Sequence, residues 1–203
     1  MEIFLIILFS YLSGSIPFGL ILTKTFSGKD VRKIGSGNIG ATNVLRTGNK
    51  YLAFLTLILD GLKGFVPVLI TKFYYPEFYQ LSALVAFLGH LFPVWLKLKG
   101  GKGVAIYLGI LFAFSLQLSL LFIFTWMIVT LIFRYSSLSS MFSSLTVFAV
   151  LSLKETVSNA ISTNLTNNED YKLILFIFFI LIIYTHRGNI INLKNKSEKK
   201  INI

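Results

Sequence analysis

The sequence predicts an all-α, polytopic integral membrane protein whose polar side chains collect at one membrane surface. Its composition is the first reason: 55% of the 203 residues are hydrophobic and 13% are charged, whereas soluble domains carry about 25% charged residues. The second is a set of apolar runs near the roughly 20 residues that a helix needs to cross a bilayer. The third is an excess of basic residues, 19 Lys and Arg against eight Asp and Glu, gathered in a few short segments.

Six apolar runs mark the candidate spans, at 3–23, 51–73, 79–96, 104–133, 138–153 and 171–185. The first run follows Met1-Glu2 with neither a basic leader nor a cleavage site, so we expect a retained helix rather than a signal peptide. We see no internal repeat. We therefore expect one transmembrane domain over 1–191, followed by a basic cytoplasmic tail over 192–203.

The basic residues predict the orientation of the spans. Residues 24–50, residues 97–102, Arg134 and the chain from Arg187 onward together hold fifteen of the 19 Lys and Arg residues. Cytoplasmic connections carry an excess of these residues, so we expect all four places in the cytoplasm. The short turn at 74–78 and the polar loop at 154–170 are then expected on the outer side.

This assignment divides the longest apolar run. Lys102 and Arg134 are both expected in the cytoplasm, so an even number of crossings must separate them. Residues 104–133 are therefore predicted to form a hairpin of two short helices, each of about 15 residues or about 22 Å, turning around Ser115, Gln117 and Ser119. The count becomes seven spans, with the N-terminus outside and the C-terminus inside. The alternative is a single tilted helix that departs from the charge rule, because that rule is statistical.

The residue inventory limits the chemistry. The chain has no Cys, which excludes disulfides, thiolate metal sites and a Cys-linked acyl-enzyme. Two His residues are too few for a His-built metal centre, and we expect no metal and no cofactor. The apolar composition argues against a nucleic acid as the partner of the basic segments. An anionic ligand at the membrane surface remains.

The first glycine-rich segment, 35–46, has the composition of an anion site. Its first six residues match the pattern G-x-G-x-x-G, but the dinucleotide-binding form of that pattern needs a preceding strand, and this one follows an apolar helix. The glycines let backbone N–H groups converge on an anion, and a helix is expected to begin near Ala41. The alternative is that these residues only form turns and caps. Four basic neighbours favour the oxyanion site.

The second glycine-rich segment, 89–105, contains Lys-Gly-Gly-Lys-Gly. It is not a Walker A loop, because no Ser or Thr follows the lysine. Lys102 lies between glycines, where its ammonium and the backbone reach the same ligand. Lys97 and Lys99 are expected to be snorkelling anchors at a helix end, and His90 is expected to be a packed, hydrogen-bonded helix residue rather than a base.

Three further features lie elsewhere in the chain. The serine-rich stretch 134–140 has the simple explanation of a capped helix start. His186 and Asn189 are three residues apart at the end of the last span and could face one ligand. Asp60 and Lys63 are the charges that lie deep in a span, and we expect an internal ion pair that packs helices, with small residues such as Gly61 at the contact.

Together these segments resemble the bacterial acyl-phosphate:glycerol-3-phosphate acyltransferase family. The matching stretches run from the first span to the last, at 14–19, 35–46, 60–64, 89–105, 134–140 and 186–189. The departures are Leu98 in place of an aromatic residue, Asn192 in place of an arginine, and a richer serine run. The resemblance implies a seven-helix enzyme of the bacterial inner membrane with a cytoplasmic active site. It would transfer a fatty acyl group from acyl phosphate to glycerol 3-phosphate, giving lysophosphatidic acid and phosphate in phospholipid synthesis.

The resemblance also implies roles for individual residues. The phosphate of the acyl donor would be cradled by Ser36, Asn38, Gly40, Thr42 and Asn43. Arg46 and Lys102 would neutralise the two phosphates and the charge of the transition state. Glycerol 3-phosphate would be held by Ser140, His186 and Asn189, with Ser137 and Ser139 as rivals for the serine role. The proton acceptor is either His186 or a phosphate oxygen of the substrate. Neither His has an Asp five positions later, so the His-x-x-x-x-Asp motif of acyl-thioester enzymes does not occur.

Two other function classes compete with this prediction. A small anion channel or phosphate carrier would use the same basic loops as a vestibule. Transporters place polar groups near mid-bilayer, and the middle of these spans is nearly bare of them. A scaffold that binds anionic lipid headgroups is the third possibility, and the two glycine-rich segments argue against it.

Overall fold

The computed structural model describes residues 1–161 and 171–201, with the side chains of its longest helix described as far as Leu153. Within these residues every regular element is a helix. They form two compact units, Met1–Leu116 and Gln117–Ile203, and each is described by itself. Residues 162–170 of the predicted outer loop lie outside the described residues.

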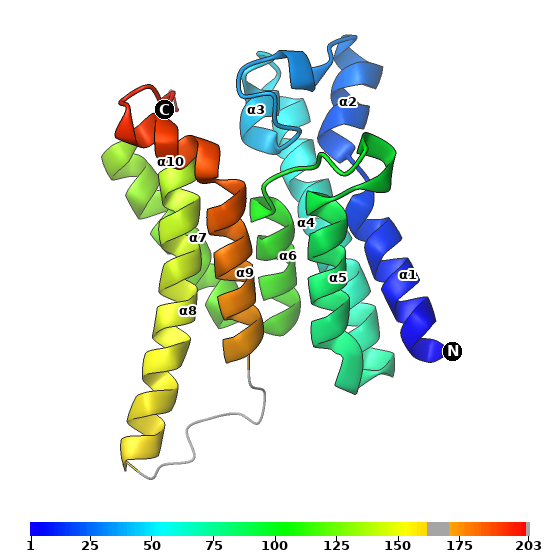
Figure 1. Cartoon of the computed structure of the whole chain (residues 1–203), viewed down its shortest axis with the longest axis vertical. Coiled ribbons are helices and arrows are strands. Elements are labelled where there is room, and N and C mark those ends of the chain that lie inside the picture. The colour runs from blue at the N-terminus through cyan, green and yellow to red at the C-terminus, as the bar shows by residue number, and fades with distance from the viewer. Residues whose placement is uncertain (162–170, 202–203) are drawn as a thin grey trace. The chain divides into compact units, whose positions relative to one another are not determined.

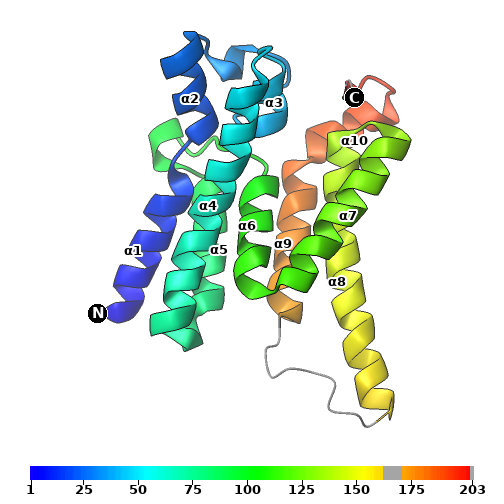
Figure 2. The same ribbon diagram turned by 180° about the vertical axis from the view of Figure 1, so that it is seen from behind.

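Unit 1 contains six α-helices and three short 3-10 helices (Figures 1 and 2). They are α1 (Glu2–Ser15), α2 (Phe18–Ser27), η1 (Val31–Lys33), α3 (Ala41–Leu45), α4 (Lys50–Tyr74), η2 (Pro76–Phe78), α5 (Tyr79–Leu91), η3 (Val94–Leu96) and α6 (Val104–Phe114). The first apolar run was expected to be one helix, and the structure corrects this. Helix α1 ends at Ser15 and α2 begins at Phe18, because Pro17 lacks an amide hydrogen and its ring crowds the preceding turn.

Small residues bring the helices of unit 1 close together. Helix α4 packs against α6, and α1 packs against α5. A Cβ added to Gly109 of α6 would collide with the backbone of Gly61 on α4. Close backbone approach of this kind is a common basis of helix association in membranes. It confirms the expected helix contact at Gly61.

Unit 2 consists of α7 (Leu116–Phe133), α8 (Ser136–Ile161), α9 (Lys172–Thr185) and α10 (Arg187–Lys194). Helices α8 and α9 pack together, with Phe148 against Phe176 and Phe179 at ring-centroid distances of 5.3 and 6.4 Å. The axis bends by 56° between α9 and α10.

The run 104–133 is divided into two helices, as predicted. The break lies at Ser115, which has an extended backbone (φ −161°, ψ 127°). The two helices have unequal lengths, 11 residues in α6 and 18 in α7. At 1.5 Å per residue α6 is about 16 Å long, so it is much shorter than the expected arm.

The described residues of the basic tail, 192–201, make contacts within unit 2. Helix α10 continues to Lys194, past the predicted boundary at 191. Beyond it, Ile201 N donates to Arg134 O at 2.8 Å, and the Lys200 ammonium lies 5.7 Å from the centre of the Tyr135 ring. The tail therefore packs against the start of α8.

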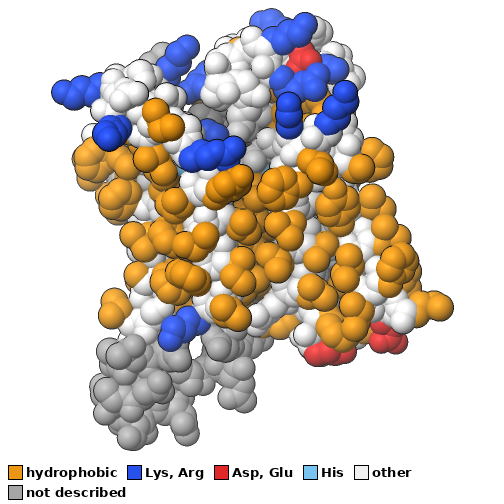
Figure 3. Space-filling model, viewed as in Figure 1, with side chains coloured by type: hydrophobic (Ala, Val, Ile, Leu, Met, Phe, Trp, Pro, Cys, Tyr) orange, Lys and Arg blue, Asp and Glu red, His pale blue; other side chains and the backbone are white. Residues whose placement is uncertain are grey.

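The helices confirm a multi-pass membrane protein. Among the described residues, five helices are long and apolar enough to cross a bilayer, with α1 and α2 taken as one stretch, and the number is six if α9 and α10 also form one span. In unit 1, α2, α3 and the connection containing η3 lie at the same end (Figures 1 and 2). Lys and Arg side chains gather at this end, above a flank of hydrophobic side chains (Figure 3). Both basic segments of unit 1 thus share one side, as predicted.

Candidate active site

Asn43 holds the first glycine-rich loop in shape. Its side chain is buried, and its Nδ2 donates to the carbonyl oxygens of Val31, Ile34 and Asn38 at 2.9, 2.9 and 2.7 Å. Its Oδ1 accepts from the backbone N–H of Ser36 at 3.0 Å. One amide therefore joins both ends of the loop.

This contact also explains the glycine at position 35. Gly35 has φ +56°, a left-handed conformation that favours glycine. A Cβ at this position would collide with Oδ1 of Asn43. Both donor hydrogens of the Asn43 amide are used by carbonyl oxygens of the loop, so this side chain determines the shape of the loop.

The remaining residues of the loop face outward to different degrees. Ser36 and Arg46 are exposed, and Asn38, Gly40 and Thr42 are half-buried. Asn38 Oδ1 accepts from Gly40 N at 2.9 Å and so shapes the turn before α3. Helix α3 begins at Ala41, as predicted. Arg46 ends this short helix, with Nη1 3.5 Å from Asn43 Oδ1, so its guanidinium lies beside the loop.

The second glycine-rich loop rests on His90. The backbone N–H of Gly101 donates to His90 O at 3.1 Å, and that of Gly100 donates to Leu91 O at 3.0 Å. A Cβ on Gly101 would collide with the His90 imidazole, so glycine is required by close approach. His90 is 3% exposed, which confirms it as a packed helix residue. The expected hydrogen bond is not found for its buried Nδ1, which has no partner among the described residues. Lys102 directly follows Gly101 and is half-buried.

The predicted ion pair between Asp60 and Lys63 is present, and it reaches further than expected. Lys63 Nζ lies 2.7 Å from Asp60 Oδ1, and both side chains are 2% exposed. The same Nζ donates to Ile16 O at 2.7 Å and lies 5.8 Å from the centre of the Phe18 ring. These contacts fall at the break between α1 and α2. The pair thereby ties α4 to the point where the chain turns toward the first loop.

The two glycine-rich segments meet in unit 1. A pocket of about 480 Å³ is lined by Gly37 and Ile39 from the first, by Arg32 of the preceding η1, and by 95–97, Lys99 and Gly100 from the second. The predicted convergence of these segments is therefore present in unit 1. The other predicted residues, Ser140, His186 and Asn189, belong to unit 2.

In unit 2, His186 has a defined hydrogen-bonding state. Its side chain is buried, and Nδ1 lies 2.8 Å from Ile182 O. A carbonyl oxygen only accepts, so we assign the hydrogen to Nδ1, and in the neutral ring Nε2 carries the lone pair. His186 stands at the bend between α9 and α10, with Asn189 in the first turn of α10.

The three candidate serines have different partners. Ser140 Oγ donates to Ser136 O at 2.8 Å and accepts from Trp126 Nε1 at 3.2 Å. Ser139 Oγ lies 2.7 Å from Thr130 Oγ1. Ser137 Oγ donates to Glu198 Oε1 at 2.9 Å, and the same carboxylate oxygen is hydrogen-bonded to Asn189, a predicted site residue.

That partner, Glu198, was missed by the sequence analysis. Its Oε1 accepts from Asn189 Nδ2 at 2.6 Å as well as from Ser137. One feature of the sequence could have indicated Glu198: it and Asp30 are the two acidic residues in the segments expected in the cytoplasm. In the described part of the chain no group of three His, Asp or Glu side chains could hold a metal ion.

Comparison with known proteins identifies the family. The family described as Glycerol-3-phosphate acyltransferase matches residues 4–196. A glycerol-3-phosphate acyltransferase of Pelagibacter ubique (strain HTCC1062) is 53% identical over 204 residues, covering 100% of both chains. One of Mesorhizobium japonicum is 48% identical, over 97% of this chain and 95% of its own.

Solved structures agree with this match. The crystal structure of PlsY (YgiH), an integral membrane glycerol 3-phosphate acyltransferase, in its glycerol 3-phosphate form aligns with a TM-score of 0.88. The alignment covers 100% of this chain and 96% of that chain, at 35% identity. Its lysophosphatidic acid form aligns with a TM-score of 0.85 at 34% identity. The resemblance found in the sequence is confirmed: the chain belongs to the glycerol-3-phosphate acyltransferase family, and it is an enzyme of phospholipid synthesis that transfers an acyl group to glycerol 3-phosphate.

Proposed function

We propose that the acyl donor is acyl phosphate, and that the products are lysophosphatidic acid and inorganic phosphate. The observation that carries this proposal is the meeting of two glycine-rich segments, one bearing Arg46 and the other Lys102. Two phosphate-bearing reactants need two such positions. The solved structures of a related PlsY, one in a glycerol 3-phosphate form and one in a lysophosphatidic acid form, support this acceptor and this product.

The residues divide between the two substrates. Backbone N–H groups of the first loop, with the side chains of Ser36, Asn38 and Thr42 and the backbone of Gly40, hold the phosphate of the donor. Asn43 acts there through the shape of the loop. Ser140, His186 and Asn189 hold glycerol 3-phosphate, with Ser137 favoured over Ser139 as a second serine because Ser137 and Asn189 share Glu198. Arg46 and Lys102 neutralise both phosphates.

The reaction is a direct displacement. A hydroxyl oxygen of glycerol 3-phosphate attacks the acyl carbonyl carbon, a carbon–oxygen bond forms, and the bond from that carbon to the phosphate oxygen breaks. The mixed anhydride is already activated, so no covalent acyl-enzyme is needed. Arg46 and Lys102 stabilise the charge on the leaving phosphate, and holding both substrates at one rim supplies proximity.

The hydroxyl proton goes either to Nε2 of His186 or to a phosphate oxygen of the substrate. The hydrogen bond from Nδ1 to Ile182 O supports Nε2, because it leaves the lone pair on that nitrogen. We expect His186→Gln to change the shape of the pH–rate profile as well as its height. A lower rate with an unchanged profile would assign the proton to the substrate phosphate.

In the membrane, the proposed topology has seven spans. They are α1 with α2, then α4, α5, α6, α7, α8 and α9. The N-terminus lies outside, the C-terminus lies in the cytoplasm, and the active site faces the cytoplasm at the inner membrane. Two observations support this: both basic segments of unit 1 share one end (Figure 1), and in unit 2 the tail bonds to Arg134.

The function is tested with the purified full chain in detergent. With a long-chain acyl phosphate and glycerol 3-phosphate, we expect lysophosphatidic acid and phosphate to appear in equal amounts. With acyl-CoA as the donor we expect no product. Product from acyl-CoA and none from acyl phosphate would contradict the proposed donor. Phosphate flux into proteoliposomes without any lysophosphatidic acid would favour a carrier instead.

A further inference from the structure

The segment 14–19, at the break between α1 and α2, takes no part in the proposed reaction. It is one of the stretches that carry the family resemblance, and it reads Gly-Ser-Ile-Pro-Phe-Gly. It lies outside both glycine-rich segments, and no residue in it is proposed to touch a substrate. Its contacts nevertheless reach both segments, which indicates a role in placing one against the other.

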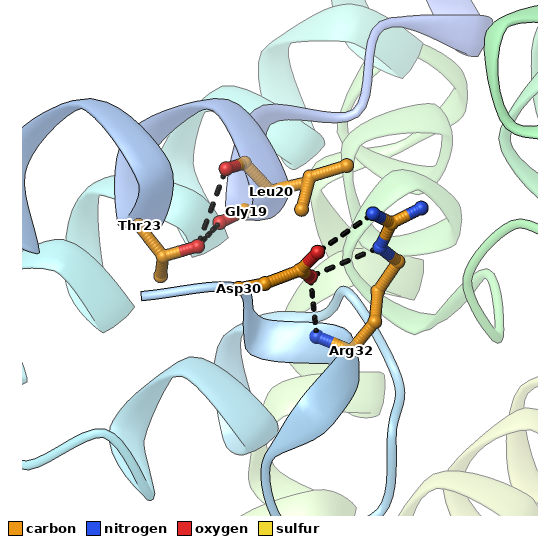
Figure 4. A network of polar contacts seen from close by, with 5 residues as sticks. All are labelled: Gly19, Leu20, Thr23, Asp30 and Arg32. Carbon is orange, nitrogen blue, oxygen red and sulfur yellow. Dashed lines mark hydrogen bonds and ion pairs between the residues drawn. The ribbon is translucent and has the colours of Figure 1, made fainter. Parts of the chain in front are cut away.

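On one side, the start of α2 packs against the first glycine-rich segment. A Cβ added to Gly19 would collide with the backbone oxygen of Ile39. Leu20 and Ile39 also belong to one buried apolar cluster. Helix α2 contacts η1 as well, and Figure 4 shows Gly19 and Leu20 near the ion pair of Asp30 and Arg32.

That ion pair fixes the chain between α2 and the first loop. The carboxylate of Asp30 accepts from Nε and Nη2 of Arg32 at 2.9 and 2.7 Å, and from its backbone N–H at 3.0 Å (Figure 4). Hydrogen bonds from Arg32 hold the pKa of Asp30 well below its usual range, so the carboxylate stays charged at neutral pH. It caps η1, whose Val31 carbonyl is one of the three that Asn43 holds. The first loop is thereby anchored to the start of α2.

On the other side, the end of α1 holds the part of the second glycine-rich segment that precedes its glycines. Ser15 Oγ accepts from Trp95 Nε1 at 2.8 Å, and the Tyr11 hydroxyl donates to Phe92 O at 2.8 Å. Ser15 is 1% exposed, and its own hydroxyl hydrogen goes to Leu12 O at 2.8 Å. Its oxygen therefore faces the indole as a fixed acceptor. Trp95 is 60% exposed, yet its one polar atom is turned inward to this buried serine.

The hydrogen bond to Trp95 bears on the position of Lys102. Trp95 lies in η3, and its neighbour Leu96 packs against the apolar cluster of the first segment. Beyond η3, residues 100–101 bond to the end of α5. A shift of η3 would therefore move both the packing between the two segments and the loop that carries Lys102. A misplacement of about 1 Å is enough to slow a reaction between two bound groups.

We propose that Ser15 is a positioning residue for acyl transfer and acts through Trp95. Their hydrogen bond fixes the second glycine-rich segment against the first, so that the Lys102 ammonium reaches the donor phosphate held by the first loop. The proposal rests on the proposed function of these two loops. Ser15 itself touches no substrate.

The KM for acyl phosphate tests this role, because KM does not depend on how much of the enzyme is folded. The full chain is purified in detergent and assayed by phosphate release with saturating glycerol 3-phosphate. Ser15→Ala removes the acceptor, and Trp95→Phe removes the donor from an exposed side chain. We expect each change to raise the KM for acyl phosphate about fivefold, since one hydrogen bond contributes a factor of about this size.

The double variant shows whether the two residues act through one bond. Ser15→Ala with Trp95→Phe should raise the KM no further than either change alone, because the bond is already lost. A rise of about 25-fold would mean that the two residues act independently, and it would contradict the proposal.

Ser10→Ala is the matched control. Ser10 lies on the same helix, is fully buried, and has its Oγ 2.9 Å from Ser82 Oγ of α5. Its loss should lower the melting temperature about as much as Ser15→Ala does and leave the KM for acyl phosphate unchanged. An equal rise in KM with Ser10→Ala would mean that Ser15 contributes only to helix packing.

Fluorescence shows whether the intended bond is the one removed. The chain has two Trp residues, so Trp126→Phe leaves Trp95 as the single reporter. Ser15→Ala should shift its emission maximum, and Ser10→Ala should not. Two results would overturn the proposal: an emission shift with an unchanged KM, or no emission shift with Ser15→Ala.

A failure of the proposed donor is distinguished with the unmodified chain. If this chain forms no lysophosphatidic acid from acyl phosphate, the proposed donor is wrong, and the same variants are compared by their KM for acyl-CoA. The positioning role then holds if Ser15→Ala and Trp95→Phe raise that KM, and it is overturned if they do not.

Discussion

At the scale of single residues, Asn43 shows how a side chain without charge can determine the position of charged ones. It holds the carbonyl oxygens of residues 31, 34 and 38 and the N–H of Ser36. The shape of the first loop, and with it the place of Arg46, depends on these bonds.

Replacing this amide tests that dependence. Asn43→Asp keeps the size of the side chain but turns a carboxylate oxygen toward loop carbonyls. Each buried group left unpaired costs about 1–3 kcal/mol, so we expect the loop to open and kcat/KM to fall about 100-fold or more. The nearby Thr42→Ser is the control and should retain most activity. Normal activity of Asn43→Asp would mean that the loop is held by other contacts.

Arg46 and Lys102 carry a different prediction, because their proposed role is direct. Each charge-assisted bond to phosphate contributes about 1.5–3 kcal/mol, so Arg46→Ala and Lys102→Ala should each lower kcat/KM about tenfold to 150-fold. The fall in kcat/KM should appear both when acyl phosphate is the varied substrate and when glycerol 3-phosphate is, with phosphate release as the measurement. Lys194→Ala removes a basic side chain from α10 as a control. If both alanine variants turn over normally, these residues do not hold the phosphates.

At the scale of elements, the sequence predicted what local pattern determines and missed what distant contacts determine. The spans, the break in 104–133 and the pair Asp60–Lys63 follow from hydrophobicity, charge and spacing along one helix. The hydrogen bond from Lys63 to Ile16 spans 47 positions, and that from Ser137 to Glu198 spans 61. No local pattern encodes such partners. The predicted single helix at 3–23 was wrong because the effect of Pro17 was not considered.

The contact between Lys63 and Ile16 leads to a prediction for the α1–α2 break. Lys63→Met should lower stability by about 3–5 kcal/mol, because it leaves the Asp60 charge buried and unpaired. The double variant Lys63→Met with Asp60→Leu removes both charges, and an apolar pair of this kind recovers stability. If the pair also positions the first loop through Ile16, kcat/KM should stay low in the double variant. Thermal unfolding and turnover are measured together, and a stable, fully active double variant would reduce the pair to helix packing.

At the scale of the whole molecule, the proposed reaction requires that both phosphate loops face one compartment. Two reactants held on opposite sides of a bilayer cannot exchange an acyl group, whatever the affinity of each site. Within unit 1 both loops lie at the end that carries the Lys and Arg side chains (Figures 1 and 3). The segments of unit 2 enter the same compartment only if the chain crosses the membrane seven times, which includes α6, a helix of 11 residues.

The absence of Cys from the chain makes this requirement directly measurable. Single cysteines at the exposed positions Lys33, Lys99 and Ser197 report on the first loop, the second loop and the tail, and one at Glu77 reports on the η2 turn. In intact spheroplasts a membrane-impermeant maleimide should label the cysteine at 77 and leave the other three unlabelled until the membrane is opened.

An acyl phosphate is amphiphilic and glycerol 3-phosphate is soluble, so their meeting place must be a surface that both reach from one side. Labelling of 33 and 99 from opposite sides would separate the two phosphate positions by the bilayer and remove direct transfer as a mechanism. Labelling of the cysteine at 197 from outside would leave the proposed placement of the two loops of unit 1 unchanged. It would place His186 and Asn189 on the other side of the membrane from the donor.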